Sequence, residues 1–318
     1  MKIDGITLAS DVVLAPIAGF SDVGMRYLCA QAGAGLTYTE MVSAKGLVYG
    51  NEHTEDLLHT TDEEKVRAVQ IFGNDPQIML RAVCGRELEK FDIIDVNMGC
   101  PVKKIVSNGE GSALLKNPKL AAEIVRTLRS SGKPVTVKFR IGFCKDERTG
   151  VDFAKYMTDA GAAALTVHGR TREQFYEGAA DWDYIAEVVR ATDVPVIANG
   201  DVFSKEDYEK IKAHTGAAGV MIARGALGNP QIFSQITGRK FAYATVKETV
   251  LRHIEVLASF HSEIYTVNNM KKQIACYCKG LRGGKQLKLA AFGARTLDEL
   301  VRAVTESEAL DVAVPERR

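Results

Sequence analysis

The 318-residue sequence lacks any apolar run that approaches the roughly 18 residues of a membrane-spanning helix. Its first residues, Met1-Lys2-Ile3-Asp4-Gly5, also lack the basic and apolar regions of a secretory signal peptide. We therefore expect a cytoplasmic protein that does not bind membranes.

Cysteine motifs are also absent. The cysteines are dispersed, and the nearest two, Cys276 and Cys278, are separated by a single residue. This spacing fits neither a zinc-ligating pair nor a thioredoxin-type motif, so we expect reduced thiols and no metal site. A net charge of +1 points to no partner by itself, which means that any nucleic-acid surface must be local. No obligate protein partner is evident.

The chain also lacks the Gly-x-Gly-x-x-Gly motif of a doubly wound dinucleotide-binding sheet, which leaves that architecture as the runner-up. Short apolar segments instead predict strands at 12–15, 36–39, 69–72, 93–97, 135–139, 164–168, 195–199 and 219–222. Helical patterns lie between them, one of them capped by Ser21 and running to about Gln31, others at 118–130 and after Ser204. The series predicts an α/β fold, a (β/α)8 TIM barrel.

The strand pattern stops after about residue 240. Thr245 and Thr296 each begin a capping-box pattern ahead of a helix. We therefore predict a catalytic barrel domain over residues 1–240 and a helical domain over residues 241–318.

Polar residues stand at most of the predicted strand ends, which meet at one mouth in such a barrel. Gly200 and Asp201 follow the seventh strand, and Arg224 and Gly225 follow the eighth. Barrels commonly bind phosphate at this place, where glycine allows close approach and arginine adds a charged fork of donors. The sequence therefore predicts a phosphate-bearing cofactor.

Several separated motifs match one family. The run Ile94-Asp95-Val96-Asn97-Met98-Gly99-Cys100-Pro101, followed by Ile105 and Gly111-Ser112, resembles the signature of the tRNA-dihydrouridine synthases. Ala15-Pro16-Ile17-Ala18-Gly19 resembles their first-strand flavin loop, and Gln70 and the segments 137–140, 168–172, 199–201 and 223–225 match in order. The segments 97–104 and 168–182 look most like the bacterial B-type branch. The resemblance is dense over residues 10–235 and looser over the tail.

This resemblance implies an FMN- and NADPH-dependent oxidoreductase that reduces the 5,6 double bond of specific D-loop uridines in tRNA. Hydride would pass from flavin N5 to C6. Cys100 would protonate C5, because a thiol with a pKa of about 8.5 keeps its proton at neutral pH. The residues implied for FMN binding are Pro16, Ile17, Ala18, Gln70, Lys138, His168, Asn199, Gly200, Asp201, Ala223 and Arg224.

Acidic residues are absent from the segment between Tyr265 and Arg295, which carries many lysines and arginines. Such a segment suits RNA phosphates, although a solvated basic helix face is the simpler alternative. Asn97 would orient the uracil unless it only shapes the turn, and Arg170 and Arg172 would contact tRNA or flavin phosphate unless they are surface residues. The expected substrate-binding residues are Asn97, Arg170, Arg172, Lys271, Lys272 and Arg282.

Two other interpretations use the same residues. Another FMN barrel, such as a dihydroorotate dehydrogenase or an ene-reductase, would share Lys138 and the phosphate site but would not need the basic segment. A tRNA-binding barrel that has lost catalysis would keep the basic segment but would not need all of the family's motif residues between Gln70 and Arg224.

Overall fold

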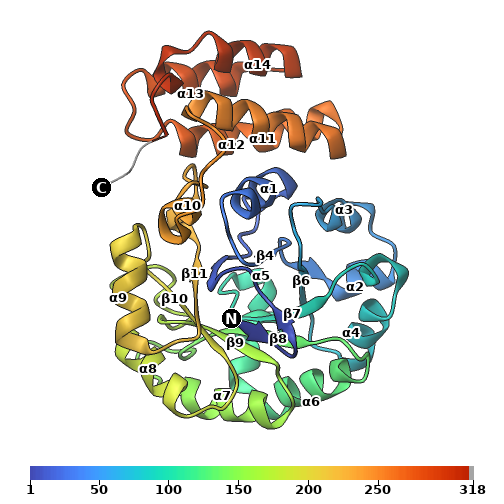
Figure 1. The fold of residues 1–318 in the computed structure, drawn as a ribbon. Coiled ribbons are helices and arrows are strands. Elements are labelled where there is room, and N and C mark those ends of the chain that lie inside the picture. Colours follow the sequence, from blue (N-terminus) through green and yellow to red (C-terminus); the bar gives the residue numbers. More distant parts are fainter. Residues whose placement is uncertain (315–318) are drawn as a thin grey trace.

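Eight parallel strands follow one another around a barrel in residues 1–314, the part of the chain that the computed structural model describes (Figure 1). Their order is β3-β11-β10-β9-β8-β7-β6-β4, and a parallel bridge between Val13 and Leu36 joins β3 to β4. The strands are β3 (Val12–Leu14), β4 (Thr37–Tyr38), β6 (Arg67–Phe72), β7 (Ile93–Met98), β8 (Val135–Arg140), β9 (Ala164–His168), β10 (Val196–Asn199) and β11 (Gly219–Ile222). Each corresponds to a predicted strand, so the predicted barrel is confirmed.

Three short strands were not predicted. β1 (Lys2–Ile3) and β2 (Ile6–Thr7) form an antiparallel hairpin, and β5 (Val42–Ser43) pairs with β6. Ile3 and the neighbouring Leu8 are buried in the same apolar cluster as Leu36 and Ile93 from the barrel strands. The hairpin therefore covers the amino-terminal end of the barrel, which leaves the carboxyl end for the functional site.

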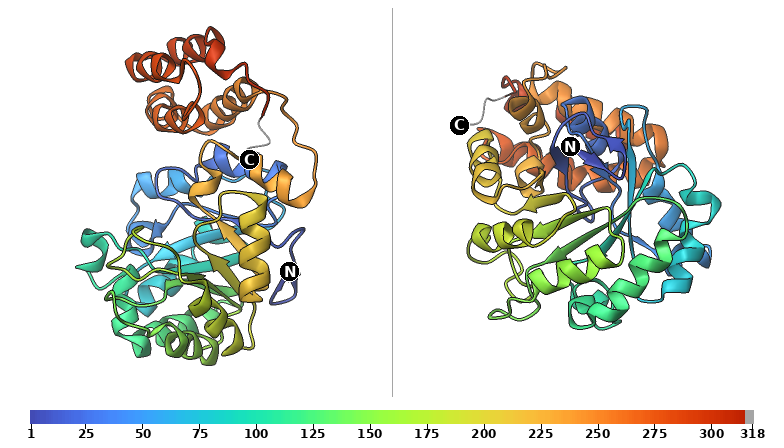
Figure 2. Two further views of the ribbon diagram at one scale, coloured as in Figure 1. Left: turned by 90° about the vertical axis from the view of Figure 1, so that its left-hand side faces the viewer. Right: turned by 60° about the horizontal axis from the view of Figure 1, so that its bottom comes forward.

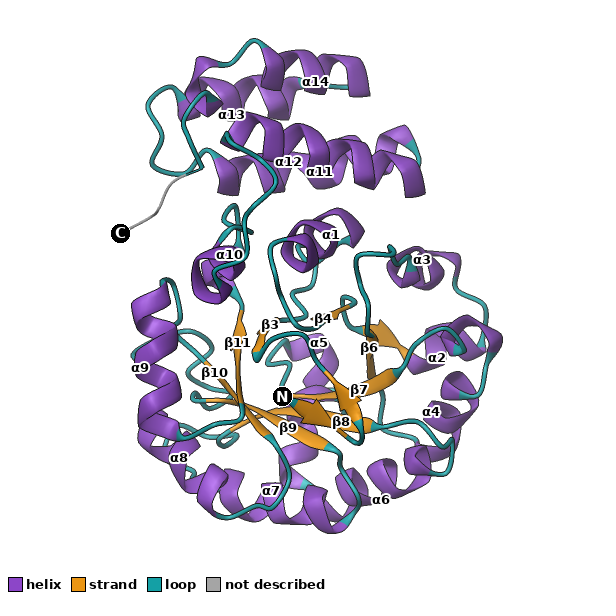
Figure 3. Cartoon of the chain, viewed as in Figure 1, coloured by secondary structure: helices purple, strands orange, loops and turns teal. Residues whose placement is uncertain are grey.

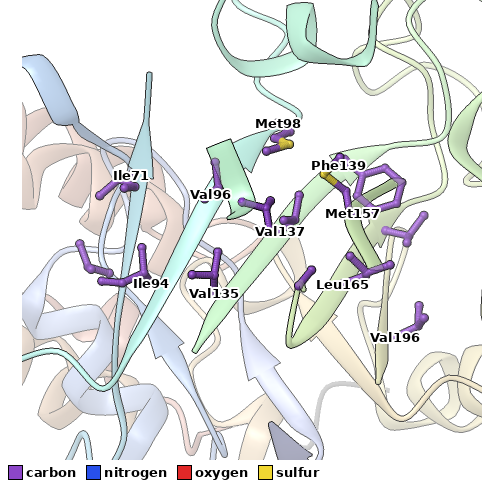
Figure 4. Close-up of a cluster of buried hydrophobic side chains, with 14 of the residues drawn as sticks. Ile71, Ile94, Val96, Met98, Val135, Val137, Phe139, Met157, Leu165 and Val196 are labelled. Carbon is purple, nitrogen blue, oxygen red and sulfur yellow. The ribbon is translucent and has the colours of Figure 1, made fainter. Parts of the chain in front are cut away.

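Alternating side chains divide the barrel into an inner and an outer layer. On β7, Ile94, Val96 and Met98 point outward into the large core between the strands and the helices. Figure 4 shows these side chains beside their counterparts on neighbouring strands, such as Val137. The intervening residues of β7 point into the barrel, so its polar residues lie inside.

Helices surround the strands (Figure 3). Around the barrel these are α1 (Val23–Gln31), α2 (Ala44–Val48), α3 (Glu52–Glu55), α4 (Pro76–Val83), α5 (Lys103–Val106), α6 (Pro118–Arg129), α7 (Gly150–Asp159), α8 (Trp182–Arg190), α9 (Lys205–Thr215) and α10 (Ile232–Thr237). Within residues 1–314, none of the helices combines the length and apolarity that crossing a membrane requires.

The chain continues from α10 into a helical region that has its own apolar core. It comprises α11 (Val246–Phe260), α12 (Glu263–Tyr277), α13 (Gly284–Gly293) and α14 (Leu297–Thr305), gathered beyond α1 and α10 in Figure 2. Helix α11 packs against α1, and Val23 of α1 belongs to the helical core. We keep residue 240 as the proposed boundary between the two parts.

Capping residues agree with the sequence at three helices and differ at one. Ser204 caps α9, Thr296 caps α14, and Thr245 and Glu248 form the complete capping box of α11. The prediction that Ser21 caps α1 was wrong, because the Asp22 carboxylate accepts the hydrogen bond from the backbone N–H of Met25.

Candidate active site

A cavity of about 360 Å³ opens at the carboxyl ends of the barrel strands, within the usual size range of ligand pockets. Three cationic side chains line it, Lys138, Arg140 and Arg224, against one acidic side chain, Asp201. The cavity is therefore suited to an anionic ligand. The predicted site residues in its lining are Pro16, Ile17, Ala18, Asn97, Cys100, Lys138, His168, Asn199, Gly200, Asp201, Ala223 and Arg224.

Strand register brings several of these side chains to one level. Asn97 of β7 is opposite Lys138 of β8, and His168 of β9 is opposite both Arg140 of β8 and Asn199 of β10. Because alternate residues of a strand share a face, these inward positions form a polar ring at the carboxyl end of the barrel interior.

Cys100 lies in the turn that follows β7. The Asn97 side-chain oxygen accepts hydrogen bonds from the backbone N–H groups of Gly99, at 3.2 Å, and Cys100, at 2.9 Å. Gly111 has φ +61°, and a Cβ there would lie 3.0 Å from the Cys100 carbonyl oxygen. The turn thus requires glycine at position 111. Burial raises the pKa of the Cys100 thiol, so the half-buried sulfur carries a proton at neutral pH.

Lys138 projects into the cavity and donates to the Asn199 side-chain oxygen at 3.2 Å, while the Asn199 amide donates to the Met221 carbonyl at 2.8 Å. Burial, assisted by the charge of Arg140, lowers the pKa of Lys138 to about 8. Burial and the surrounding cations hold the pKa of His168 well below its ordinary value. At neutral pH Lys138 is therefore charged and His168 is neutral.

Arg140 is a cavity residue to which the sequence assigned no role. Its Nε donates to the carbonyl of Gly99, and its Nη1 donates to the carbonyls of Thr171 and Phe175. It therefore ties the turn that carries Cys100 to the loop after β9. Tyr176 of that loop, 53% exposed, lies against the guanidinium groups of Arg140 and Arg224. Such a loop aromatic residue has no periodic pattern that would reveal it.

Asp201, in the cavity lining, joins Arg224 of the lining to the buried Arg170 behind it. Its carboxylate accepts from Arg170 at 2.7 Å and from Arg224 at 3.0 Å. Burial alone would raise the pKa of Asp201, but these hydrogen bonds and that from Ala180 outweigh it, and the pKa lies below its ordinary value. Asp201 thus holds Arg224 at the cavity with part of its charge already balanced.

Three predicted site residues of the barrel lie outside the cavity lining. Arg170 is buried and donates to the carbonyls of Glu177 and Gly178 as well as to Asp201, so it has no exposed surface for a nucleic acid. Arg172 packs against the ring of Phe143. Gln70 is also buried and hydrogen-bonds to Asp95 beneath the cavity and to Asn97 in the cavity lining.

The basic residues of the helical region lie on and beyond α12. Arg282 is exposed, whereas Lys271 and Lys272 are half-buried. The ammonium group of Lys272 lies 5.8 Å from the centre of the Phe20 ring, next to the loop that supplies Ile17 and Ala18 to the cavity. One edge of the basic segment therefore reaches the cavity rim.

A group of potential metal ligands lies at the junction of the barrel and the helical region. Ligand atoms of Asp56, His59 and His261 are within 4.8 Å of one another. Burial is the main cause of the lowered pKa of His59, and the positive charges of Lys90 and Arg26 lower it further. The same two charges oppose a bound cation. The absence of a metal site stays a prediction.

Comparison with known proteins identifies the family. A model described as dihydrouridine synthase matches residues 13–314. The chain belongs to the dihydrouridine synthase family. Dihydrouridine synthases are oxidoreductases, and this chain is 37% identical to tRNA-dihydrouridine synthase B of Pseudomonas aeruginosa over 91% of its length and 90% of that protein. It is 36% identical to the protein of the same name from Shewanella oneidensis, over 87% of this chain and 89% of that one.

A solved structure supports the fold of this dihydrouridine synthase. Histamine dehydrogenase from Rhizobium sp. 4-9 superposes with a TM-score of 0.59 at 11% identity, covering 82% of this chain and 50% of that one. At this identity the likeness shows a shared barrel and nothing about chemistry. The B-type resemblance that the sequence motifs indicated is confirmed by the relatives.

Proposed function

We propose that this dihydrouridine synthase reduces the 5,6 double bond of specific D-loop uridines in tRNA, with FMN as bound cofactor and NADPH as electron donor. The observation that carries the proposal is the position of Cys100, whose protonated thiol lies in the lining of a cationic cavity at the barrel mouth. We further propose that the reaction takes place in the cytoplasm, where tRNA resides.

The donors around the cavity fit FMN. Arg224 and the turns at Gly200 and Gly225 offer a charged fork and accessible backbone for the phosphate. Lys138 supplies a positive charge and His168 a neutral ring that can donate or accept. When bound, FMN supplies the hydride that adds to uracil C6.

Cys100 supplies the proton for C5. Its raised pKa keeps the thiol protonated, and the nearby charges of Arg140 and Lys138 stabilise the thiolate that remains after the proton has left. Asn97 holds the turn through its oxygen, so it orients the acid that meets the uracil. Solvent then restores the proton, because Cys100 is only partly buried.

The basic segment is proposed to hold the tRNA. Lys272 lies at the cavity rim and Arg282 on the exposed surface beyond it, so phosphates along this face would lead toward the cavity. A uridine must leave its stack to enter a cavity of this kind, and this is easier in a loop than in a helix. A D-loop uridine meets that condition.

The test is the Cys100→Ala variant, with Cys144→Ala as control because Cys144 is a half-buried thiol outside the cavity lining. Each protein is loaded with FMN, reduced by NADPH and incubated with unmodified tRNA. We expect Cys100→Ala to bind FMN normally and to lose most dihydrouridine formation, whereas Cys144→Ala keeps it. Full activity of Cys100→Ala, or flavin reoxidation by small enones but not by tRNA, would contradict the proposal.

A further inference from the structure

A carboxylate lies inside the barrel beneath the cavity. Asp95 of β7 is 1% exposed and, in the part of the chain that the structure describes, no lysine, arginine or histidine forms an ion pair with it. Register places it between Gln70 of β6 and Thr136 of β8. Burying a carboxylate without a cation opposes folding, and apolar side chains of similar size commonly stabilise such positions.

Hydrogen bonds connect this carboxylate to the turn that carries Cys100. Asp95 accepts from the Thr136 hydroxyl at 2.6 Å and from the Gln70 amide nitrogen at 2.7 Å. The Gln70 oxygen accepts from the Asn97 amide nitrogen at 2.8 Å. The Asn97 oxygen then accepts from the backbone N–H groups of the Cys100 turn.

The donor and acceptor roles in this series of hydrogen bonds are fixed from both of its ends. An ionised carboxylate can only accept, so Gln70 must turn its NH2 group toward Asp95 and its oxygen toward Asn97. At the other end, two backbone N–H groups need an acceptor, so Asn97 must turn its oxygen to the turn and its NH2 group to Gln70. Asp95 at one end and the backbone N–H groups of the turn at the other therefore hold both amides in a single orientation.

We propose that Asp95 is a positioning residue, whose carboxylate holds the Cys100 thiol in place through Gln70 and Asn97. Its catalytic consequence rests on the proposed function, but its effect on the thiol does not. The carboxylate is not part of the cavity lining, so its effect on the position of the thiol passes through the two amides.

The charge state of the site agrees with this role. Burial raises the pKa of Asp95 to about 6, against a lowering by the hydrogen bonds from Gln70 and Thr136. The other titratable groups that act on it are Lys138 on β8 and Tyr38 on β4. At neutral pH the carboxylate is therefore ionised and accepts only.

The experiment measures the rate of Cys100 alkylation by iodoacetamide, followed by peptide mass spectrometry, with Cys144 of the same protein as internal reference. Wild type is compared with Asp95→Leu, which removes the acceptor, and with Asp95→Asn, whose side-chain oxygen can still accept from Gln70. Asp152→Asn, an exposed carboxylate on α7, is the control.

We expect Asp95→Leu to raise the alkylation rate of Cys100 by about fivefold, equivalent to about 1 kcal/mol of lost turn stabilisation, with Cys144 unchanged. Asp95→Asn should restore most of the wild-type rate. In FMN-loaded protein kcat for tRNA should fall while KM stays constant, since the basic segment is intact. Asp152→Asn should match wild type throughout.

Gln70→Met breaks the next link and provides a second route if Asp95→Leu does not fold. It should raise the alkylation rate similarly. Where Asp95→Leu folds, adding it to Gln70→Met should raise the rate no further, because both changes break the same series of hydrogen bonds. If Asp95→Leu and Gln70→Met both fold and both alkylate Cys100 at rates within twofold of wild type, the proposal is overturned. If wild type forms no dihydrouridine, the proposed function fails, but the alkylation rates still decide the role of Asp95.

Discussion

Replacing Asp22 with alanine would test how the helical region is attached to the barrel. The buried carboxylate accepts from His253 of α11 at 2.8 Å and from Gln273 of α12 at 2.7 Å. It also caps α1 through the N–H of Met25. One side chain therefore stabilises both the first helix and the contact between the two parts of the chain.

The expected loss can be worked out from these contacts. Losing a cap costs about 1 kcal/mol, and removing one partner of a buried ion pair costs about 3–5 kcal/mol because the other group stays buried and unpaired. Asp75 is the matched control, because it caps α4 by accepting from Gln77 and Ile78 but, within residues 1–314, contacts no hydrogen-bond partner in the helical region. Asp75→Ala should cost only about 1 kcal/mol, whereas Asp22→Ala loses both contributions and should cost about 4–6 kcal/mol.

Guanidinium unfolding followed by circular dichroism at pH 7 gives both free energies of unfolding. Burial would raise the pKa of Asp22, but the His253 charge and the hydrogen bonds lower it below the ordinary 3.8. The contribution of Asp22 is therefore complete above that pH and is lost as the pH falls through the folded-state pKa. An Asp22→Ala loss no larger than that of Asp75→Ala would refute the reasoning.

Three further predictions concern the cavity and the basic segment. In the flavin-free protein, FMN affinity measured by fluorescence quenching should fall as the pH rises through about 8, where Lys138 loses its charge, and Lys138→Arg should remove that decline. Gly111→Ala should destabilise the protein more than Gly132→Ala in thermal unfolding, since both glycines have positive φ but only the first would bring a Cβ against the Cys100 turn; equal losses would contradict this. Changing Lys271, Lys272 and Arg282 together to alanine should weaken tRNA binding, measured by filter binding at several salt concentrations, while FMN stays bound. The slope of the binding constant against salt concentration should fall by an amount that corresponds to at most about three phosphate contacts. A control triple on exposed positions of α8 and α9 should leave affinity unchanged, and equal effects of the two triples would place the tRNA elsewhere. The control positions are Arg190, Lys205 and Lys210.

Some features of the site needed the folded chain. Arg170 stands in a polar loop that reads as a surface segment, yet it is buried because Asp201, on the next strand end, pairs with it. Arg140 and Tyr176 meet only because the loop after β9 folds over the end of β8. Neither contact has a local sequence pattern, since each joins residues from different βα units.

The sequence by itself determined the eight barrel strands, three of the four helix caps that it predicted, and the position of Cys100 after β7. These depend on neighbours within a few residues, through side-chain alternation and short-range hydrogen bonds, which a linear pattern records. Only the tertiary structure decided that Asp22 rather than Ser21 caps α1, because the carboxylate also meets His253 from α11. It also decided that Gln70 lies beneath the cavity between Asp95 and Asn97, because strand register selects those partners.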